Sequence, residues 1–578
     1  MGGLGRLVEY LLKYKWSIVV GLLFVVITNT VASAVPWVVK YAIDALEAGL
    51  PESKLAEYAW IIVGITVLQG VFRFFMRMVL IGTSRKIEYD LRNDFFLHLQ
   101  RLSPDFYNKT STGDLMARAT NDLNAVRDLV GPALMHSFST FIAIAASLYW
   151  MVRIDPLLTL LTLAVLPALA IVVNRMGGTL HKAYREVQDQ YAVMSSMVQE
   201  NLGGIRVVKA YGQEAGEIAR FEELNKEYVR RNMLSAKLSA IFRPLLRVIV
   251  VVALSAVLWL GGNMVINGTM TIGEFVAFMV YLMALTWPMI GVGWVLNLFQ
   301  LGTASMARLN AVWDRKPTIA DGPATRPIER IGGDIVFDNV TFSYNGREVL
   351  KNLSLTIPEG KTIAVVGRTG SGKSTLVNLI PRFFDPKDGS VTIGGVDLRT
   401  MPLAVLRSHI GYVPQEIFLF SDSIEKNIAF GPAEKDADAI ERAARLAHLD
   451  GDIRELPDKY KTLLGERGVN LSGGQRQRVA IARAMILNPK ILILDDALSS
   501  VDSDTEAEIL TRLSELRDGR TVVTVSHRIS SVIDAHEILV MEEGRIAERG
   551  THRELVEADG VYAEMYRKQL ITAELESL

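Results

Sequence analysis

The stretch Thr362-Ile-Ala-Val-Val366, followed by Gly367-Arg-Thr-Gly-Ser-Gly-Lys-Ser374, decides the fold of the C-terminal part of this chain. The first segment predicts a buried strand, and a helical pattern follows the glycine-rich loop, so G-x-x-x-x-G-K-[ST] stands in its strand–loop–helix context. The glycines let backbone N–H groups surround phosphate oxygens, and the helix N-terminus adds positive potential. We expect Lys373 to reach the β- and γ-phosphates of a nucleotide and Ser374 to bind Mg²⁺. The predicted nucleotide-binding residues here are Gly367, Arg368, Thr369, Gly370, Ser371, Gly372, Lys373, Ser374 and Thr375.

A second apolar segment, Ile491-Leu-Ile-Leu494, predicts another buried strand and places Asp495 at its C-terminal end. At that position a carboxylate can hold Mg²⁺ beside the first loop. Between the two segments lies Leu471-Ser-Gly-Gly-Gln475, directly before a predicted helix. A Ser-Gly-Gly at a helix start is also an anion cradle. Because one phosphate-binding loop is enough to bind the phosphates of one nucleotide, this second anion-binding segment suits a nucleotide that is bound mainly by another subunit.

Composition indicates one region that faces lipid and another that faces water. Of 578 residues, 50% are hydrophobic and 22% are charged, and the mean hydropathy is +0.24. A membrane domain joined to a soluble domain combines these values more readily than one well-mixed domain does. The net charge of −1 gives no electrostatic case for nucleic-acid binding. The absence of cysteine excludes disulfides and cysteine-ligated metals.

Long apolar segments in the first part of the chain predict a transmembrane domain, because a helix needs about 20 apolar residues to cross the hydrocarbon. The predicted spans cover residues 16–38, 58–82, 129–152, 156–174, 244–262 and 275–298. The long connections after the second and fourth spans carry helical patterns and are expected to extend beyond the bilayer. Trp287-Pro288 predicts a kink in the sixth span, because proline removes a backbone hydrogen bond. We place the transmembrane domain at 1–312, a linker at 313–330 and a nucleotide-binding domain at 331–578.

Loop charges predict the orientation of these spans. Basic residues (Arg6, Lys13 and Lys15) precede the first span, and the loop after it is acidic. The positive-inside rule then places the N-terminus in the cytoplasm, and an even number of spans places the C-terminus there too. The first apolar stretch is too long for the h-region of a cleavable signal peptide. A short N-terminus without a targeting sequence is typical of a protein of a bacterial inner membrane.

Four arginines lie in or beside the predicted spans. Arg73 and Arg77 are one helical turn apart in the second span, and Arg243 and Arg247 flank the start of the fifth. One interpretation is that these side chains extend to water at the inner interface. The other is that they line an inner cavity and favour substrates with an anionic group.

The order of the C-terminal motifs resembles that of the ATP-binding cassette (ABC) superfamily, whose signature is LSGGQ, here Leu471, Ser472, Gly473, Gly474 and Gln475. The resemblance implies that Tyr344 stacks on adenine, that Gln415 senses Mg²⁺ and contacts the membrane domain, and that His527 acts at the γ-phosphate. The implied Mg²⁺ ligands are Ser374, Gln415 and Asp495. Six spans before one cassette match an exporter half-transporter, with coupling regions near Thr112–Leu115 and Gly203–Lys209. The implied fold is an α-helical membrane domain followed by an α/β P-loop domain of ABC type, with ATP and Mg²⁺ as cofactors.

One position departs from the family pattern, which places a glutamate directly after the magnesium aspartate as general base for the attacking water. This chain reads Asp495-Asp496. With a fixed backbone, the shorter side chain retracts the carboxylate by about 1.3–1.5 Å. A misplaced base loses much of the roughly 10²–10⁴-fold acceleration that proton transfer supplies.

The same resemblance implies that two cassettes enclose two ATP molecules, each between the P-loop of one subunit and the signature of the other. We therefore expect a heterodimeric exporter of drugs, peptides or lipids. The P-loop of this chain would hold ATP in a slow site with Asp496 as its impaired catalytic residue. Its signature would complete the active site of a partner that carries the usual glutamate.

Other functions stay open at this point. One is a homodimeric exporter with slow hydrolysis. Another is an ATP-regulated membrane protein that does not hydrolyse ATP, for which Asp496 is the only support. A P-loop enzyme fused to a membrane anchor ranks last, because six spans are more than an anchor needs.

Overall fold

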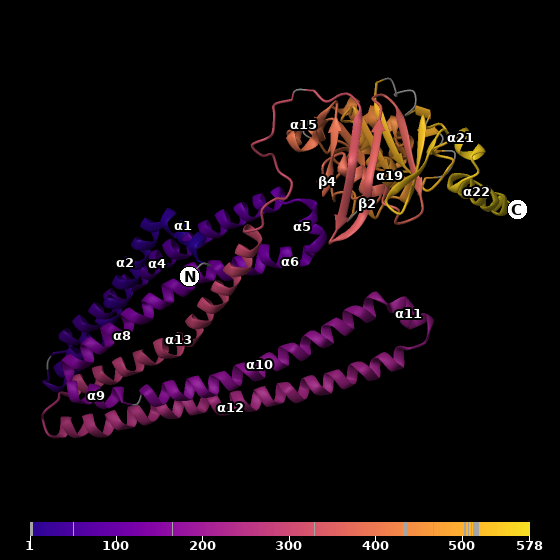
Figure 1. Cartoon of the computed structure of the whole chain (residues 1–578). Helices are drawn as coiled ribbons and strands as arrows, with labels where there is room; N and C mark the ends of the chain where they lie inside the picture. Colours follow the sequence, from indigo (N-terminus) through magenta and orange to yellow (C-terminus); the bar gives the residue numbers. More distant parts are fainter. Residues whose placement is uncertain are drawn as a thin grey trace. The chain divides into compact units, whose positions relative to one another are not determined.

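The computed structural model describes residues 4–49, 51–164, 166–328, 330–431, 436–465, 468–501, 505–506, 508–509, 511–512 and 519–577. The chain forms two compact units (Figure 1). The helical unit comprises residues 1–97 and 113–314, and the α/β unit comprises residues 98–112 and 315–578.

Helices of very different length build the helical unit. They are α1 (Gly5–Lys13), α2 (Lys15–Ser33), α3 (Val35–Glu47), α4 (Glu52–Arg101), α6 (Thr112–Ala117), α7 (Leu123–Asp128), α8 (Leu134–Ile154), α9 (Pro156–Leu163), α10 (Leu166–Gly203), α11 (Ile205–Ala210), α12 (Glu214–Ile266) and α13 (Ile272–Trp313). Two π-helical turns, Arg118–Asp122 and Leu129–Ala133, flank α7. With a rise of about 1.5 Å per residue, the 50 residues of α4 and the 53 of α12 far exceed the thickness of a bilayer. The connections after the second and fourth predicted spans are therefore helical, as expected.

Among the described residues, four helical stretches are long and apolar enough to cross a membrane. They are Lys15–Glu47, Glu52–Arg101, Thr112–Ile154 and Glu214–Ile266, and a shorter apolar helix covers Ile272–Leu285. The predicted span 156–174 includes residue 165, which lies outside the described residues, so the count of six stays a prediction. Pro288 lies within α13, which continues through it to Trp313.

Two predicted spans are divided into shorter helices. The first breaks between α2 and α3, where Pro36 occupies the first turn of α3. The fourth breaks after α9, and α10 begins at Leu166, next to Pro167. Proline has no N–H to donate, so it is tolerated in the first turn of a helix and ends the helix before it.

The pair α10 and α12 forms a long antiparallel hairpin joined through α11 (Figure 1). These two helices pack mainly against each other, and their principal contacts with the rest of the unit are made with α9 and α13. Many apolar side chains on them are exposed in the single chain, among them Val198, Leu202, Val229, Met233 and Val251.

A buried polar contact fixes α13 against the first π-helical turn. Asp122 is only 7% exposed and accepts hydrogen bonds from Ser305 Oγ at 2.9 Å and Arg308 Nε at 3.0 Å. A buried carboxylate needs such donors, so the contact specifies one register between the two elements.

The α/β unit contains two sheets. The antiparallel sheet has the order β2-β1-β4-β5, and the other has the order β10-β9-β3-β8-β7-β6. In the second sheet β9, β3, β8, β7 and β6 are parallel, and β10 is antiparallel to β9. The strands are β1 (Ile335–Tyr344), β2 (Arg347–Ile357), β3 (Thr362–Gly367), β4 (Asp388–Ile393), β5 (Val396–Asp397), β6 (Ile410–Val413), β7 (Ile491–Asp495), β8 (Thr521–Val525), β9 (Glu537–Glu542) and β10 (Arg545–Gly550).

Helices complete the α/β unit. They are α5 (Pro104–Lys109), α14 (Lys373–Leu379), α15 (Leu403–Ser408), α16 (Ile424–Ile428), α17 (Ala437–Leu446), α18 (Asp450–Glu455), α19 (Gly473–Met485), α21 (His552–Glu557) and α22 (Val561–Ser577). One core joins the two sheets around Phe337, Leu350 and Val365. The other packs α16, α17 and α19 against β7 through residues such as Ile428 and Ile481.

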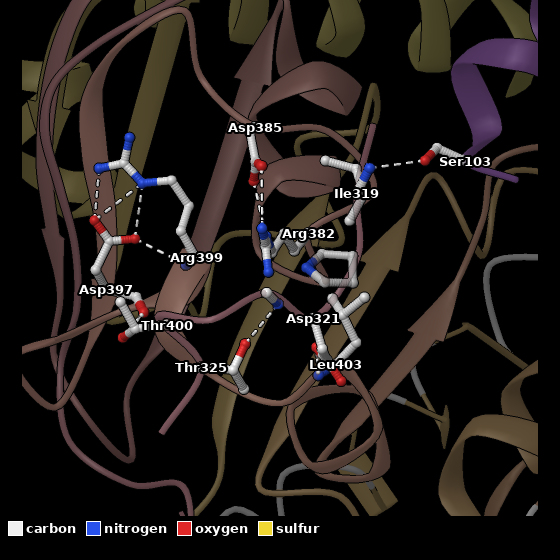
Figure 2. Close-up of polar contacts among 12 residues, drawn as sticks. Ser103, Ile319, Asp321, Thr325, Arg382, Asp385, Asp397, Arg399, Thr400 and Leu403 are labelled. Carbon is white, nitrogen blue, oxygen red and sulfur yellow. Dashed lines mark hydrogen bonds and ion pairs between the residues drawn. The ribbon is translucent and has the colours of Figure 1, made fainter. Parts of the chain in front are cut away.

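The segment before β1 is fixed to the α/β unit by backbone donors (Figure 2). Ile319 N–H donates to Ser103 Oγ at 2.9 Å, and both residues are buried. Leu403 N–H donates to Asp321 Oδ1, also at 2.9 Å. Within the predicted linker 313–330 these contacts hold the chain against the unit that follows it.

Candidate nucleotide-binding site

The carboxyl ends of neighbouring parallel strands gather the predicted site residues. The order β3-β8-β7-β6 places the glycine-rich loop after β3 next to His527, which follows β8. Asp495 ends β7, and Gln415 lies two residues after β6. Ligands of open α/β sheets bind at this edge.

These residues line one cavity of about 210 Å³. Its lining consists of Tyr344, Val349, Thr369, Gly370, Gly372, Lys373, Ser374, Thr375, Gln415, Asp495, Asp496, Val525 and His527. The structure thus brings together most of the residues that the sequence predicts for one nucleotide. Of the predicted residues, Gly367, Arg368 and Ser371 lie in the loop behind the lining, and Leu471–Gln475 are not part of it.

The glycine-rich loop fits a phosphate group. Lys373 is 5% exposed, and its Nζ donates to the carbonyl oxygens of Gly367 at 2.9 Å and Arg368 at 3.0 Å. Burial lowers the pKa of the Lys373 ammonium, while the Asp495 and Asp496 carboxylates act in the opposite direction. Ser371 Oγ is buried without a hydrogen-bond partner among the described residues, so the loop holds a buried cation and an orphaned hydroxyl close together.

All three glycines of this loop have a positive φ that other residues rarely adopt, with φ +149° at Gly367. Gly370 has φ +83° and Gly372 has φ +102°. A Cβ on Gly372 would come within 3.2 Å of the Val349 carbonyl oxygen. Both the conformation and the close approach therefore require glycine.

Ser374 and Asp495 form a polar pair suited to Mg²⁺. Ser374 Oγ donates to Asp495 Oδ1 at 3.0 Å. Burial raises the pKa of Asp495, which is 2% exposed, while the hydrogen bond from Ser374 acts against this shift. Within the described chain no group of three His, Asp or Glu side chains could hold a metal. A hydroxyl and one carboxylate fit Mg²⁺, which takes its other ligands from phosphates and water.

Asp496 lines the cavity with an unusual backbone. Its φ is +50°, a conformation in which Asp and Asn are several-fold enriched among non-glycine residues. Its N–H donates to the Val525 carbonyl at 2.9 Å, and its carbonyl accepts from Ser499 Oγ at 3.1 Å. The backbone of Asp496 is therefore fixed from two sides.

His527 faces the same charges from the neighbouring strand. Burial and the Lys373 ammonium lower the pKa of His527, and the Asp496 carboxylate partly opposes them. The imidazole is therefore neutral at pH 7 in this structure. Gln569 of α22 fixes the loop: its Nε2 donates to the His527 carbonyl at 2.6 Å, and its Oε1 accepts from Ile529 N–H at 2.8 Å.

Tyr344 reaches the cavity from the antiparallel sheet. Its ring makes edge contacts with Phe342 and Phe384, at centroid distances of 4.8 and 5.4 Å. Burial raises the pKa of its phenol. The aromatic cluster fixes the ring plane beside the glycine-rich loop.

The signature segment forms the start of α19. Ser472 Oγ accepts from Gln475 N–H at 3.1 Å, and Gln475 Oε1 accepts from Ser472 N–H at 3.0 Å, which is a capping box. A hydroxyl has one donor and two acceptor positions, so Ser472 keeps its O–H for a ligand. Ser472 is exposed in the single chain.

Several contact residues had no sequence signal. Val349 lines the cavity from β2. Gln477 of α19 donates to Ser499 Oγ at 3.0 Å and accepts from Ser500 N–H at 2.9 Å, which connects the signature helix to the segment after Asp496. Gln569 is more than 40 residues from His527. From the sequence alone, glutamines at such positions are expected to be surface residues. Only the fold shows that Gln477 and Gln569 form hydrogen bonds with segments far away in the sequence.

Comparison with known proteins covers almost the whole chain. The model described as ABC transporter transmembrane region matches residues 18–289, and the one described as ABC transporter matches residues 350–499. The chain is 37% identical to the probable multidrug resistance ABC transporter ATP-binding/permease protein YheI of Bacillus subtilis, over 98% of this chain and 97% of that protein. It is 34% identical to the ATP-dependent lipid A-core flippase of Desulfotalea psychrophila, over 98% and 99%. A solved bacterial Atm1-family ABC exporter with ATP bound superposes with a TM-score of 0.80 at 28% identity, over 96% and 98%.

Proposed function

Because this chain belongs to the ABC transporter family, as an exporter with a transmembrane region followed by an ATP-hydrolysing domain, we propose that it is one subunit of a heterodimeric exporter. Its own P-loop holds ATP and Mg²⁺ in a slow site. Its signature completes the fast site of a partner that carries a catalytic glutamate. The substrates are drugs, peptides or lipids, and the subunit lies in the inner membrane with both termini in the cytoplasm.

The observation that carries this proposal is the position of Asp496. It lines the cavity together with Lys373, Ser374, Asp495 and His527, so the rest of the hydrolytic apparatus is in place. Because its backbone is fixed by Val525 and Ser499, the main chain has little freedom to advance the short carboxylate toward a water. Correct placement of the base is worth several powers of ten in rate.

Roles for the other site residues follow from the cavity. Tyr344 would stack on the adenine, and the loop Gly367–Thr375 would hold the phosphates. Ser374, Asp495 and Gln415 would bind Mg²⁺, and His527 would contact the γ-phosphate. The supporting geometry is the shared cavity and the 3.0 Å contact between Ser374 and Asp495.

Two features support a second subunit. The signature residues Leu471–Gln475 do not line the cavity of their own chain, and Ser472 has an O–H free for a ligand. The α10/α12 hairpin exposes apolar residues such as Leu202, Met233 and Val251. Some of these face lipid, and the remainder fit a surface supplied by another chain.

One observation also favours the alternative, a homodimer with slow hydrolysis. The other residues expected for hydrolysis share one cavity: Lys373, Ser374, Asp495 and His527. ATP hydrolysis by a purified complex with a glutamate-bearing half-transporter distinguishes the two. We expect Asp496→Ala to change the rate of the complex less than twofold, and Glu→Gln in the partner to reduce the rate to the slow hydrolysis of the Asp496 site. Strong hydrolysis by this chain alone, lost on Asp496→Ala, would instead establish the homodimer.

A further inference from the structure

A polar cavity lies inside the helical unit, between helices that are apolar overall. It has a volume of about 180 Å³ and is lined by residues of α2, α4 and α8. The polar groups that line it include Thr28, Asn29, Gln69, Arg73, Arg77 and His136. None of these belongs to the nucleotide site.

The arginines lie on one face of α4. Gln69, Arg73 and Arg77 follow at intervals of four residues, and side chains at this spacing share a face of a helix. The helix around them is apolar enough to cross a membrane. Arginines that extend to water at the interface would turn away from the bundle, whereas Arg73 and Arg77 line the cavity together with His136 of α8.

The positive charges have no carboxylate partner in the described part of the chain. The cavity lining contains no Asp or Glu, and neither Arg73 nor Arg77 appears in an ion pair with any described residue. An arginine at the centre of a bilayer costs at least about 2.5–3.5 kcal/mol, so such residues usually pair or bind a ligand. Both side chains are exposed in the single chain and are open to an incoming group.

A buried hydroxyl in the same cavity also lacks a partner. Thr28 is 5% exposed, and its Oγ1 has no hydrogen bond among the described residues. Next to it, Asn29 Nδ2 donates to Ser139 Oγ at 3.1 Å, which joins α2 to α8. His136 is held edge-on against Trp294 at a centroid distance of 5.0 Å. The wall is thus fixed by internal contacts, while the arginines and Thr28 are left for a ligand.

We propose that this cavity binds the anionic group, a phosphate or carboxylate, of an amphiphile that the exporter moves. The assignment rests on the proposed transport function and adds a substrate class to it. Guanidinium groups bind phosphate and carboxylate through paired N–H donors, and Thr28 and Gln69 offer neutral donors beside them. Since the cavity lies among helices that are long and apolar enough to cross a membrane, we expect its ligand to carry an apolar part.

Binding of short-chain lipids to the purified full-length protein tests the proposal. Dihexanoyl phosphatidic acid is the anionic probe, dihexanoyl phosphatidylcholine the zwitterionic one and inorganic phosphate the soluble anion. We expect phosphatidic acid to bind at least tenfold more tightly than phosphatidylcholine, measured by calorimetry and by the rise in Tm. The double variant Arg73→Gln/Arg77→Gln should lose this tenfold preference.

Matched variants keep the test decisive. Arg247→Gln removes an exposed arginine of α12 outside the cavity and should leave the preference unchanged. Arg73→Lys/Arg77→Lys keeps both charges, so partial binding is expected even if the glutamine variant folds poorly. Equal binding of both lipids, or equal loss in Arg247→Gln, would overturn the proposal. Displacement of phosphatidic acid by equimolar inorganic phosphate would show that the cavity binds soluble anions, and it would overturn the assignment of an amphiphile as the ligand.

Failure of this inference is separable from failure of the proposed function. Absence of charge-selective binding, with ATP binding and hydrolysis by the complex intact, would remove only the anion site. Fast ATP hydrolysis by this chain alone would contradict the proposal of one fast and one slow ATP site. Anion binding at Arg73 and Arg77 would be unaffected.

Discussion

Lys373 is a buried ammonium whose hydrogen bonds go only to the carbonyl oxygens of Gly367 and Arg368 among the described residues. A phosphate would replace these weak acceptors with charged ones. We predict that Lys373→Ala lowers ATP affinity at least tenfold, measured with a fluorescent ATP analogue. Lys387→Ala, which removes an exposed lysine 3.8 Å from Glu348, is the control and should bind normally. Unchanged affinity in Lys373→Ala would exclude this loop as the phosphate site.

The phosphate loop could be predicted from sequence because its chemistry is contiguous. Residues 362–374 contain the strand, the glycines and the lysine in one run. The backbone of Asp496 could not be predicted, because its φ of +50° follows from bonds to Val525 and Ser499 made only in the folded sheet. The sequence showed the short carboxylate but not why its main chain is fixed.

At the scale of elements, the capping box of α19 gives a separable test of the signature. Ser472→Ala removes the acceptor of Gln475 N–H and the free O–H, at a cost of about 1 kcal/mol in stability. We predict at least a tenfold lower ATP hydrolysis rate in the complex, with ATP affinity of the chain's own P-loop unchanged. The control Thr551→Ala removes the matching capping box of α21. Equal losses in both variants would mean that only helix stability was affected.

Arg483 connects α19 to α16 and to the loop that precedes α16. Its Nε donates to the Asn427 carbonyl at 2.8 Å and its Nη1 to the Phe418 carbonyl at 2.9 Å. Burial lowers the pKa of Arg483 to about 10, so it remains charged at neutral pH. We predict that Arg483→Ala destabilises the α/β unit by about 2–4 kcal/mol, because buried acceptors lose their donor.

The midpoint temperature for loss of ATP-analogue binding measures this effect. Arg549→Ala removes an exposed ion pair with Glu537 and should cost less than about 1 kcal/mol. A shift in Arg483→Ala no larger than in Arg549→Ala would contradict the structural role of Arg483.

Element boundaries in the membrane part were harder to predict than element types. Runs of apolar residues indicate helices, but the breaks before α3 and α10 depend on Pro36 and Pro167. The mean hydropathy of a segment of about 20 residues hardly changes with a single proline, so it does not reveal these breaks. The partnership of α10 with α12 depends on contacts between segments far apart in the sequence, so apolar length alone gives no information about it.

At the scale of the whole molecule, the absence of cysteine allows a clean test of orientation. Ala48→Cys lies between α3 and α4, and Gln213→Cys lies before α12; both positions are exposed. With the N-terminus in the cytoplasm, a membrane-impermeant maleimide should label position 48 in intact cells and position 213 only after permeabilisation. The reverse pattern would contradict the orientation, and the cysteine-free parent chain gives the background.

The unequal pair of ATP sites is tested most directly by the hydrolysis rate of this chain's own site. In a complex whose partner carries Glu→Gln at its catalytic position, the remaining rate comes from the site of Asp496. Asp496→Glu extends the carboxylate by about 1.3–1.5 Å, against a modest backbone cost at φ +50°. We predict that this substitution raises the rate at least tenfold. A complex that already hydrolyses ATP rapidly with Asp496, gains nothing from Asp496→Glu and loses its activity in Asp496→Ala would contradict the account.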